Sequence, residues 1–419
     1  MVIACFRLIR CKLAVQNNQF WGFKKALKTN AVLLTFVSVF VALFSQKDLQ
    51  AQSATNLKYS PELGSTYEIG RILRIYPDLP AIDYTGICRL DIDFNTYGAQ
   101  WWNKAYRYPT LGCQLASGWL GNNDVLGAFF AVVPNLRFKL FAAKHNEFYT
   151  RVGMGFAYFT KPYNRETNPG NMLIGSAITN ITSLQFMYSR ALSPSYWVNA
   201  GVGFLHFSNG HTQLPNVGLN MPSLQLGISI REFGTPIVEP TKEMNVLASN
   251  ELTMDAIVGL GFHEFGETTE PTGGIKYPVY SFGLALSRNL GTIHVVQLGF
   301  TYTYYTSFRD YIVNQSFFNE QLSLNASTFA LYAGHEFVLG QFGLDLKLGM
   351  YLYNPFRRKY NREVLDKPNG FKDISTNKLG INFYFSDTRL KRKGLYMGMH
   401  IKANLGQADF AEFSMGYRF

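Results

Sequence analysis

A histidine and a serine stand two residues apart near the end of an alternating apolar segment. The face that His206 and Ser208 share is otherwise apolar, with Val198, Ala200, Val202 and Phe204. Side chains alternate between the two faces of a β-strand, so both polar groups point to the same side as these residues. A serine hydroxyl beside an imidazole base is the pair that hydrolyses esters through a covalent intermediate. The segment therefore predicts a nucleophile and a base on an apolar surface that a lipid can reach.

The residues that follow this pair supply candidates for the rest of such a site. Asn209 and Gly210 begin a turn, and their amide groups are candidate supports for an oxyanion. Asn220 starts the outward face of the next apolar strand, where it is followed by Leu224, Leu226, Ile228 and Ile230. A His-x-Ser sequence and an Asn-Gly turn also occur in ordinary hairpins, which this spacing alone leaves open. In the same loop, we expect His211 and Thr212 to contact lipid head groups or solvent.

Composition and periodicity indicate an all-β membrane protein. Aromatic residues make up 16% of the chain, and charged residues also make up 16%. Three C-terminal segments, 342–352, 395–405 and 411–419, alternate strictly for about ten residues, as transmembrane β-strands do. A soluble sandwich shows the same period but does not usually end on an aromatic residue. The ending at Phe419 resembles the terminal signal of outer-membrane barrels, which makes the barrel-assembly machinery an expected partner.

Counting strands back from Phe419 predicts one large barrel. Sixteen candidate strands can be placed, or fourteen if the two weakest are left out. The prediction is a single transmembrane antiparallel β-barrel of the outer-membrane type over residues 53–419, with a hairpin at 196–233 that carries the site. With Phe419 on the periplasmic side, segment 196–208 runs outward and ends at the level of the outer leaflet. Short inner turns and long outer loops, such as the basic 354–376, fit this orientation.

Residues 1–52 are predicted to be a leader. Three lysines precede an apolar run at 31–44, which has the length of a signal-peptide core and is short for a membrane anchor. Without the leader the formal net charge falls from +11 to +5, so the composition does not indicate nucleic acid binding. Export to the outer membrane is expected. Cys88 and Cys113 would then meet an oxidising compartment that permits a disulfide, although the sequence does not say whether they meet.

Several motifs together resemble one enzyme family. The central one runs from His206-Phe-Ser208-Asn209 to Pro215-Asn216-x-Gly218-x-Asn220. Further segments lie upstream: Trp101–Tyr106, Tyr108–Gly112, Leu120–Asn122, Gly155–Pro162, Thr167–Asn171 and Ile174–Ser176. Over about residues 95–232 the chain resembles the outer-membrane lipid A 3-O-deacylases, the acyloxyacyl hydrolase-like family, and in particular its longer members.

The resemblance implies a serine esterase that removes an acyl chain from lipid A of lipopolysaccharide, with outer-membrane lipids around it and no metal or cofactor. Ser208 would be the nucleophile, His206 the general base and Asn209 the oxyanion support, while Asn216 would help to hold the site. The acidic member of the family's triad falls at Asn220, which is an amide here. Three outcomes are open: a working Ser-His-Asn site, a carboxylate from elsewhere such as Glu232, or a weakened enzyme. We favour the first.

Other functions remain as alternatives. A non-catalytic barrel, such as a porin, a transporter or an envelope-binding protein, would concentrate charge in its lumen and form no contact between the serine and the histidine. A phospholipase would differ only in its substrate. His263-Glu264 is not followed by a second histidine at helical spacing, so the sequence does not predict a zinc protease.

Overall fold

The computed structural model describes most of the chain beyond the leader. The described residues are 62–73, 79–96, 100–143, 145–231, 251–269, 274–367, 370–386 and 393–419. The predicted leader, the connection at 232–250 and Glu232 lie outside these ranges. The expectations attached to them are therefore not addressed by the structure.

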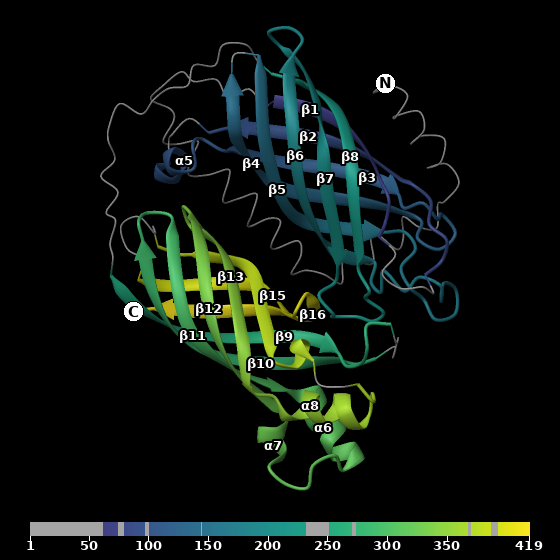
Figure 1. The fold of residues 1–419 in the computed structure, drawn as a ribbon, viewed down its shortest axis with the longest axis vertical. Helices are drawn as coiled ribbons and strands as arrows, with labels where there is room; N and C mark the ends of the chain where they lie inside the picture. Colours follow the sequence, from purple (N-terminus) through teal and green to yellow (C-terminus); the bar gives the residue numbers. More distant parts are fainter. Residues whose placement is uncertain are drawn as a thin grey trace.

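The described residues form sixteen antiparallel strands that close into two barrels of eight strands each (Figure 1). The first barrel contains β1 (Glu62–Gly70), β2 (Thr85–Asn95), β3 (Thr110–Trp119), β4 (Ala128–Ala143), β5 (Asn146–Phe159), β6 (Ile178–Ala191), β7 (Tyr196–Ser208) and β8 (Leu219–Ile230). The second contains β9 (Leu252–Glu264), β10 (Lys276–Leu290), β11 (His294–Tyr305), β12 (Ser327–Leu339), β13 (Phe342–Tyr353), β14 (Ser375–Tyr384), β15 (Gly394–Asn404) and β16 (Gln407–Arg418). The all-β class and the strand number are as predicted.

The prediction of one large barrel over 53–419 is wrong. Strand β1 pairs with β8, with Leu63 opposite Ile230, and β9 pairs with β16, with Asp255 opposite Arg418. Alternation within a strand says which residues face inward, but it does not say which distant strand becomes its neighbour. Eight strands enclose an interior that side chains can fill, so each half of the chain can close by itself.

Both barrels have apolar outer walls and polar interiors. In β8, Leu224 and Leu226 are both 64% exposed, whereas the intervening Gln225 is buried in the lumen. The same alternation is found in β16, where Phe413 faces outward and Glu412 inward. This pattern is the one that transmembrane barrels show, because the outer wall contacts lipid tails. None of the helices in the described ranges is long and apolar enough to cross a membrane.

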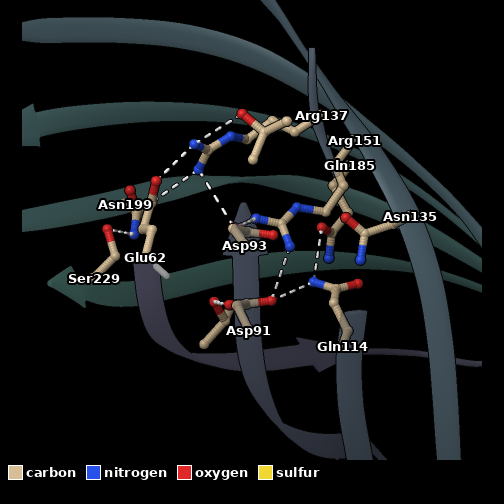
Figure 2. A network of polar contacts seen from close by, with 12 residues as sticks. Glu62, Asp91, Asp93, Gln114, Asn135, Arg137, Arg151, Gln185, Asn199 and Ser229 are labelled. Atoms are coloured by element: carbon tan, nitrogen blue, oxygen red, sulfur yellow. Dashed lines mark hydrogen bonds and ion pairs between the residues drawn. The ribbon is translucent and has the colours of Figure 1, made fainter. Parts of the chain in front are cut away.

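Paired charges fill the middle of the first barrel. Figure 2 shows Arg137 bound to Glu62 at 2.7 Å, and Arg151 bound to Asp91 at 3.1 Å and to Asp93 at 2.7 Å. All of these side chains are buried. Removing one partner of such a pair leaves an uncompensated charge in the interior, which costs about 3–5 kcal/mol. The network therefore ties β1, β2, β4 and β5 into one scaffold.

An apolar cluster fills the lumen of the first barrel next to the C-terminal end of β7. This end of the barrel is its outer end. Phe207 of β7 contacts Phe129 and Phe159 edge to face, with ring centroids 5.1 and 5.3 Å apart. All three rings are fully buried. Because Phe207 lies between His206 and Ser208 in the chain, this packing fixes the backbone that carries both polar residues.

The second barrel is also filled. Asp345 binds Lys347 at 3.0 Å and His400 at 3.1 Å, and Lys378 binds Glu412 at 2.7 Å. Two cavities in this lumen measure about 20 Å³ each, which is room for about one water molecule. Short helices and aromatic rings cover its outer end. They are α6 (Thr306–Gln315), α7 (Leu322–Asn325), α8 (Pro355–Glu363) and the 3-10 turn η1 (Phe371–Asp373).

The two barrels contact each other at both ends. Between β2 and β3, the short helix α5 (Trp101–Ala105) places Trp101 and Trp102 against Val295 and Val338 of the second barrel. A Cβ atom at Gly340 would lie 3.0 Å from the Trp102 ring, so this turn needs glycine for close approach. At the outer end, the loop after β7 contacts β9, β15 and β16. The barrels therefore lie side by side with their outer ends together.

The two cysteines of the first barrel lie on neighbouring strands but are not joined by a disulfide. Cys88 of β2 stands opposite Ser117, and Cys113 of β3 stands opposite Ile92. The question that the sequence left open is thus answered by register, because the two residues occupy different rows of the β2–β3 pair.

Candidate active site

The hairpin of β7 and β8 brings His206 and Asn220 face to face. The two residues are paired in register, and Ser208 is the last residue of β7. Leu205 and Phe207 point into the lumen, so His206 and Ser208 occupy the outward face by alternation. Phe204, one position nearer the middle of this face, is 40% exposed. The polar pair therefore lies on the outer wall, at its outer end.

His206 is oriented by the amide at position 220. His206 Nδ1 lies 2.8 Å from Asn220 Oδ1. Since an amide oxygen can only accept a hydrogen bond, Nδ1 carries the hydrogen and Nε2 is left with a free lone pair. The backbone of Asn220 is held in turn, because the Leu73 N–H donates to the Asn220 carbonyl at 2.9 Å. The amide thus sets the tautomer that a general base requires.

Two donors converge on the serine. Ser208 Oγ accepts a hydrogen bond from Asn216 Nδ2 at 3.0 Å and another from the Gly210 N–H at 3.2 Å. Between the described side chains of Ser208 and His206 there is no hydrogen bond in this structure. With both oxygen lone pairs engaged by donors, the hydroxyl hydrogen is left to point toward a base. Catalytic contacts of this kind often tighten only when substrate is bound.

Gly218 borders the space between the two residues. Its φ is +75°, a left-handed conformation that favours glycine. A Cβ atom there would lie 3.6 Å from His206 Cε1 and 4.0 Å from Ser208 Cβ. The Cε1 edge of the imidazole therefore faces the outer end of the hairpin, where Ser208 stands.

The structure assigns Asn209 a different contact from the one expected. Its Nδ2 donates to the Gln213 carbonyl at 2.7 Å and to Ser176 Oγ at 3.2 Å. Its backbone N–H donates to Asn216 Oδ1 at 3.2 Å, so Asn209 orients the amide of Asn216 and does not reach Ser208. Of the predicted oxyanion and supporting residues, Gly210 and Asn216 are the two that reach the serine oxygen. The hydrogen bond to Ser176 was not predicted from the sequence, although Ser176 belongs to one of the upstream motifs.

His211 does not contact solvent as expected, whereas Thr212 is half-buried. His211 is 6% exposed, and its ring lies 6.4 Å from the ring of His263 in the second barrel. Burial lowers the pKa of His211 below its ordinary value. Thr212 Oγ1 donates to the Asn209 carbonyl at 2.9 Å. The loop that carries the two donors therefore turns toward the second barrel.

No sequence pattern predicted that Glu264 contacts this loop. Glu264 Oε2 accepts the Leu214 N–H at 2.7 Å, and Oε1 accepts the Gly274 N–H at 2.7 Å. In this structure the contact joins the two barrels, because Glu264 ends β9 of the second barrel and Leu214 belongs to the loop after β7 of the first. Among the described residues no cluster of His, Cys, Asp and Glu side chains could hold a metal ion.

The arrangement has the parts that ester hydrolysis by serine requires. Asn220 orients His206, His206 stands near Ser208, and Asn216 and Gly210 supply hydrogen-bond donors at the serine oxygen. Side chains of the types that can serve as nucleophile, base, orienting group and oxyanion donor thus lie within one hairpin. The outward face of this hairpin is otherwise apolar, which suits a substrate with acyl chains.

Two families of known proteins match the chain, one over each barrel. Residues 87–229 match the family described as lipid A 3-O-deacylase (PagL). Residues 252–419 match the family described as acyloxyacyl hydrolase, C-terminal domain. No curated protein matches the chain.

Solved structures of outer-membrane barrels are also similar to it. The crystal structure of the outer membrane enzyme PagL is 17% identical, covering 39% of this chain and 97% of that one, with a TM-score of 0.29. Neisserial surface protein A is 9% identical, covering 42% and 99%, with a TM-score of 0.27. OccK1 of Pseudomonas aeruginosa is 9% identical, covering 86% and 98%, with a TM-score of 0.21. Similarities of this extent carry no conclusion about the present chain.

Proposed function

We propose that this chain, in which residues 87–229 match the family described as lipid A 3-O-deacylase (PagL) and residues 252–419 match the acyloxyacyl hydrolase C-terminal domain, is an outer-membrane esterase. It removes an ester-linked acyl chain from lipid A, with Ser208 as nucleophile. The observation that carries the proposal is the outward-facing pair of His206 and Asn220 beside a serine that two donors approach.

In the first half of the reaction, Ser208 Oγ attacks the ester carbonyl and its proton passes to His206 Nε2. Attack needs a lone pair of Oγ, so one of the two donors must leave it. The new oxyanion is bonded to the carbon that Oγ attacks, close to the donors from Asn216 and Gly210. Their hydrogen bonds can therefore shift from the serine oxygen to the developing charge.

In the second half, His206 returns its proton to the sugar oxygen, which leaves as an alcohol. The acyl chain remains on Ser208 as an ester. Water then attacks this ester, with His206 again taking a proton and returning it to the serine oxygen. The sum is one ester and one water converted to an alcohol and a fatty acid. The neutral Asn220 orients the imidazole throughout, but stabilises the imidazolium less than a carboxylate would.

The wall around the site supports a substrate that arrives within the membrane. Below the hairpin's polar end, Val202, Phe204 and Leu224 are exposed on the outward face. Acyl chains of an outer-leaflet lipid can lie against these residues while the ester stands at the polar end. Export by the leader and insertion by the assembly machinery through Phe419 belong to the same proposal.

The alternative of a porin or transporter draws support from the charged interiors of both barrels and from the lack of a hydrogen bond between the described side chains of Ser208 and His206. In those interiors, however, acids and bases pair with one another, as Arg89 does with Glu68 at 2.7 Å. Polar residues of the hairpin's outer end are instead gathered on the outward face. This distribution favours the esterase.

The test uses purified protein in detergent micelles with lipid A as substrate. We expect the wild type to release fatty acid and Ser208→Ala to release none. A parallel incubation with a glycerophospholipid distinguishes a phospholipase. Release from the phospholipid but not from lipid A would contradict the proposed substrate, and equal release by wild type and Ser208→Ala would contradict the mechanism.

A further inference from the structure

The loop that supplies both donors to Ser208 is held by the second barrel. Glu264, at the end of β9, accepts the Leu214 N–H at 2.7 Å, and its own N–H donates to the His211 carbonyl at 3.1 Å. The Asn216 N–H donates to the Thr268 carbonyl at 2.9 Å. Three hydrogen bonds therefore cross from the second barrel to the loop at 209–217, and one of them ends on a residue that contacts the serine.

Glu264 is placed unlike its neighbours on the same face. By alternation along β9 it shares the outward face with Leu260 and Phe262, which are each 39% exposed. Glu264 is 1% exposed. A carboxylate in such a position must have its oxygens satisfied, and both accept backbone N–H groups, from Leu214 and from Gly274.

Gly210 also meets the second barrel. Its φ is +66°, and a Cβ atom there would lie 2.9 Å from Ile401 Cδ1 of β15 and 3.5 Å from Ala411 Cβ of β16. The residue that donates its N–H to Ser208 Oγ is thus packed against the outer wall of the other barrel. Both donors therefore have contacts with the second barrel, which for Asn216 add to the hydrogen bond that its side chain accepts from the Asn209 N–H.

We propose that Glu264 is a positioning residue for the esterase and that the second barrel serves as the support of the catalytic loop. The inference rests on the proposed function. Glu264 touches neither the serine nor the substrate, and it acts by holding the Leu214–Asn216 segment so that the Asn216 amide faces Ser208. The Asn216 donor stabilises charge that exists only in the transition state, so Glu264 affects turnover and leaves substrate binding unchanged.

The test is a double-mutant cycle between Glu264→Ala and Asn216→Ala in the full-length protein. Alone, Glu264→Ala is expected to lower kcat roughly tenfold with KM within about twofold, because a lost charged hydrogen bond misplaces a donor. In the Asn216→Ala background, the same substitution is expected to change kcat by less than about twofold. Glu264→Gln retains one acceptor oxygen and should fall between wild type and Glu264→Ala.

A matched control is Glu412→Gln. Glu412 is a buried carboxylate of the same barrel, but it binds Lys378 and Ser281 within that barrel. We expect kcat to stay within about twofold of wild type in this variant. If the effects of Glu264→Ala and Asn216→Ala multiply, if KM rises while kcat stays, or if Glu412→Gln lowers kcat as much, the positioning role is refuted.

Amide hydrogen exchange separates this inference from the proposed function. Peptides covering 209–217 should exchange faster in Glu264→Ala than in wild type, while peptides from β2 and β3 stay unchanged. This readout needs no turnover and also covers variants that lose all activity. Unchanged exchange in the loop overturns the positioning role, whereas a wild type without esterase activity overturns the proposed function alone.

Discussion

Replacing the amide that orients His206 tests the central geometry of the site. Asn220 Oδ1 lies 2.8 Å from His206 Nδ1, and no other side chain is bound to this imidazole in the described structure. Asn220→Asp keeps the size of the side chain and makes the acceptor a carboxylate. Asn220→Leu keeps the size but removes the acceptor. The outward position makes leucine acceptable, because the neighbouring outward residues of β8 are apolar.

The expected changes in kcat follow from the strength of the hydrogen bond between His206 and Asn220. A neutral bond of this length contributes about 1 kcal/mol, and a bond to a charged group about 1.5–3 kcal/mol. The imidazole becomes charged during the reaction, so Asn220→Asp gains about 1 kcal/mol in the transition state at this half-buried position. That is about a fivefold rise in kcat. Asn220→Leu loses the orienting bond and the fixed tautomer, for which we expect about a tenfold fall.

The assay measures fatty acid release from lipid A on the alkaline plateau of the pH profile. Thr182→Val is the matched control. Thr182 stands opposite His206 on the other neighbouring strand, where its hydroxyl donates to Asn180 Oδ1 at 3.0 Å. It should leave kcat within about twofold. If Asn220→Asp loses as much activity as Asn220→Leu, or if Asn220→Leu is as active as wild type, the assigned role of Asn220 is wrong.

Three further predictions address the loop. Asn216→Ala removes a donor from the oxygen of Ser208 and should lower kcat by about 10²–10³-fold with little change in KM, a result that an unchanged kcat in steady-state assays would contradict. Gly218→Ala, at a φ of +75°, places a methyl group 3.1 Å from the Phe207 carbonyl oxygen, in the backbone between His206 and Ser208, and should lower activity, whereas Gly291→Ala, at a φ of +71° with no atom within 4 Å, imposes similar backbone strain and should keep activity. Burial lowers the pKa of His211, so the folded loop excludes a proton that the unfolded chain binds; its contribution to stability is full above pH ~6.5 and is lost as pH falls through the lowered value. Divided by the intrinsic exchange rate at each pH, the protection of 209–217 is expected to be lower at pH 5 than at pH 8, and to depend less on pH in His211→Phe; equal dependence in both proteins would exclude His211 as the cause.

Local pattern predicted the strands and the outward face of the site well. The alternation around Phe204 and the Asn-Gly turn after Ser208 depend only on neighbouring residues, and the structure keeps both. The division into two barrels was not predictable in this way, because closure of β1 on β8 is a contact between distant strands whose alternation would fit a larger barrel equally well. The hydrogen bond between Glu264 and Leu214 was not predictable either, because it joins residues that are distant in the chain.

The roles within the turn were predicted in part. The presence of Asn209 and Gly210 near the serine followed from their position after it, and that of Asn216 was implied by the family resemblance, but side-chain direction was not predictable. Asn209 binds Ser176, which belongs to the loop before β6, so its amide is drawn away from Ser208. His211 was expected to contact lipid head groups or solvent because it lies in the loop, outside the register of the strand, yet it packs against the second barrel.

The mass of lipid A from cells that express the protein tests the central claim most directly. Wild type and Ser208→Ala are expressed to equal amounts in the outer membrane of a host whose own lipid A retains its ester-linked chains. We predict lipid A that has lost one acyl chain in cells with the wild type and intact lipid A in cells with Ser208→Ala. Identical spectra from the two strains would contradict the account.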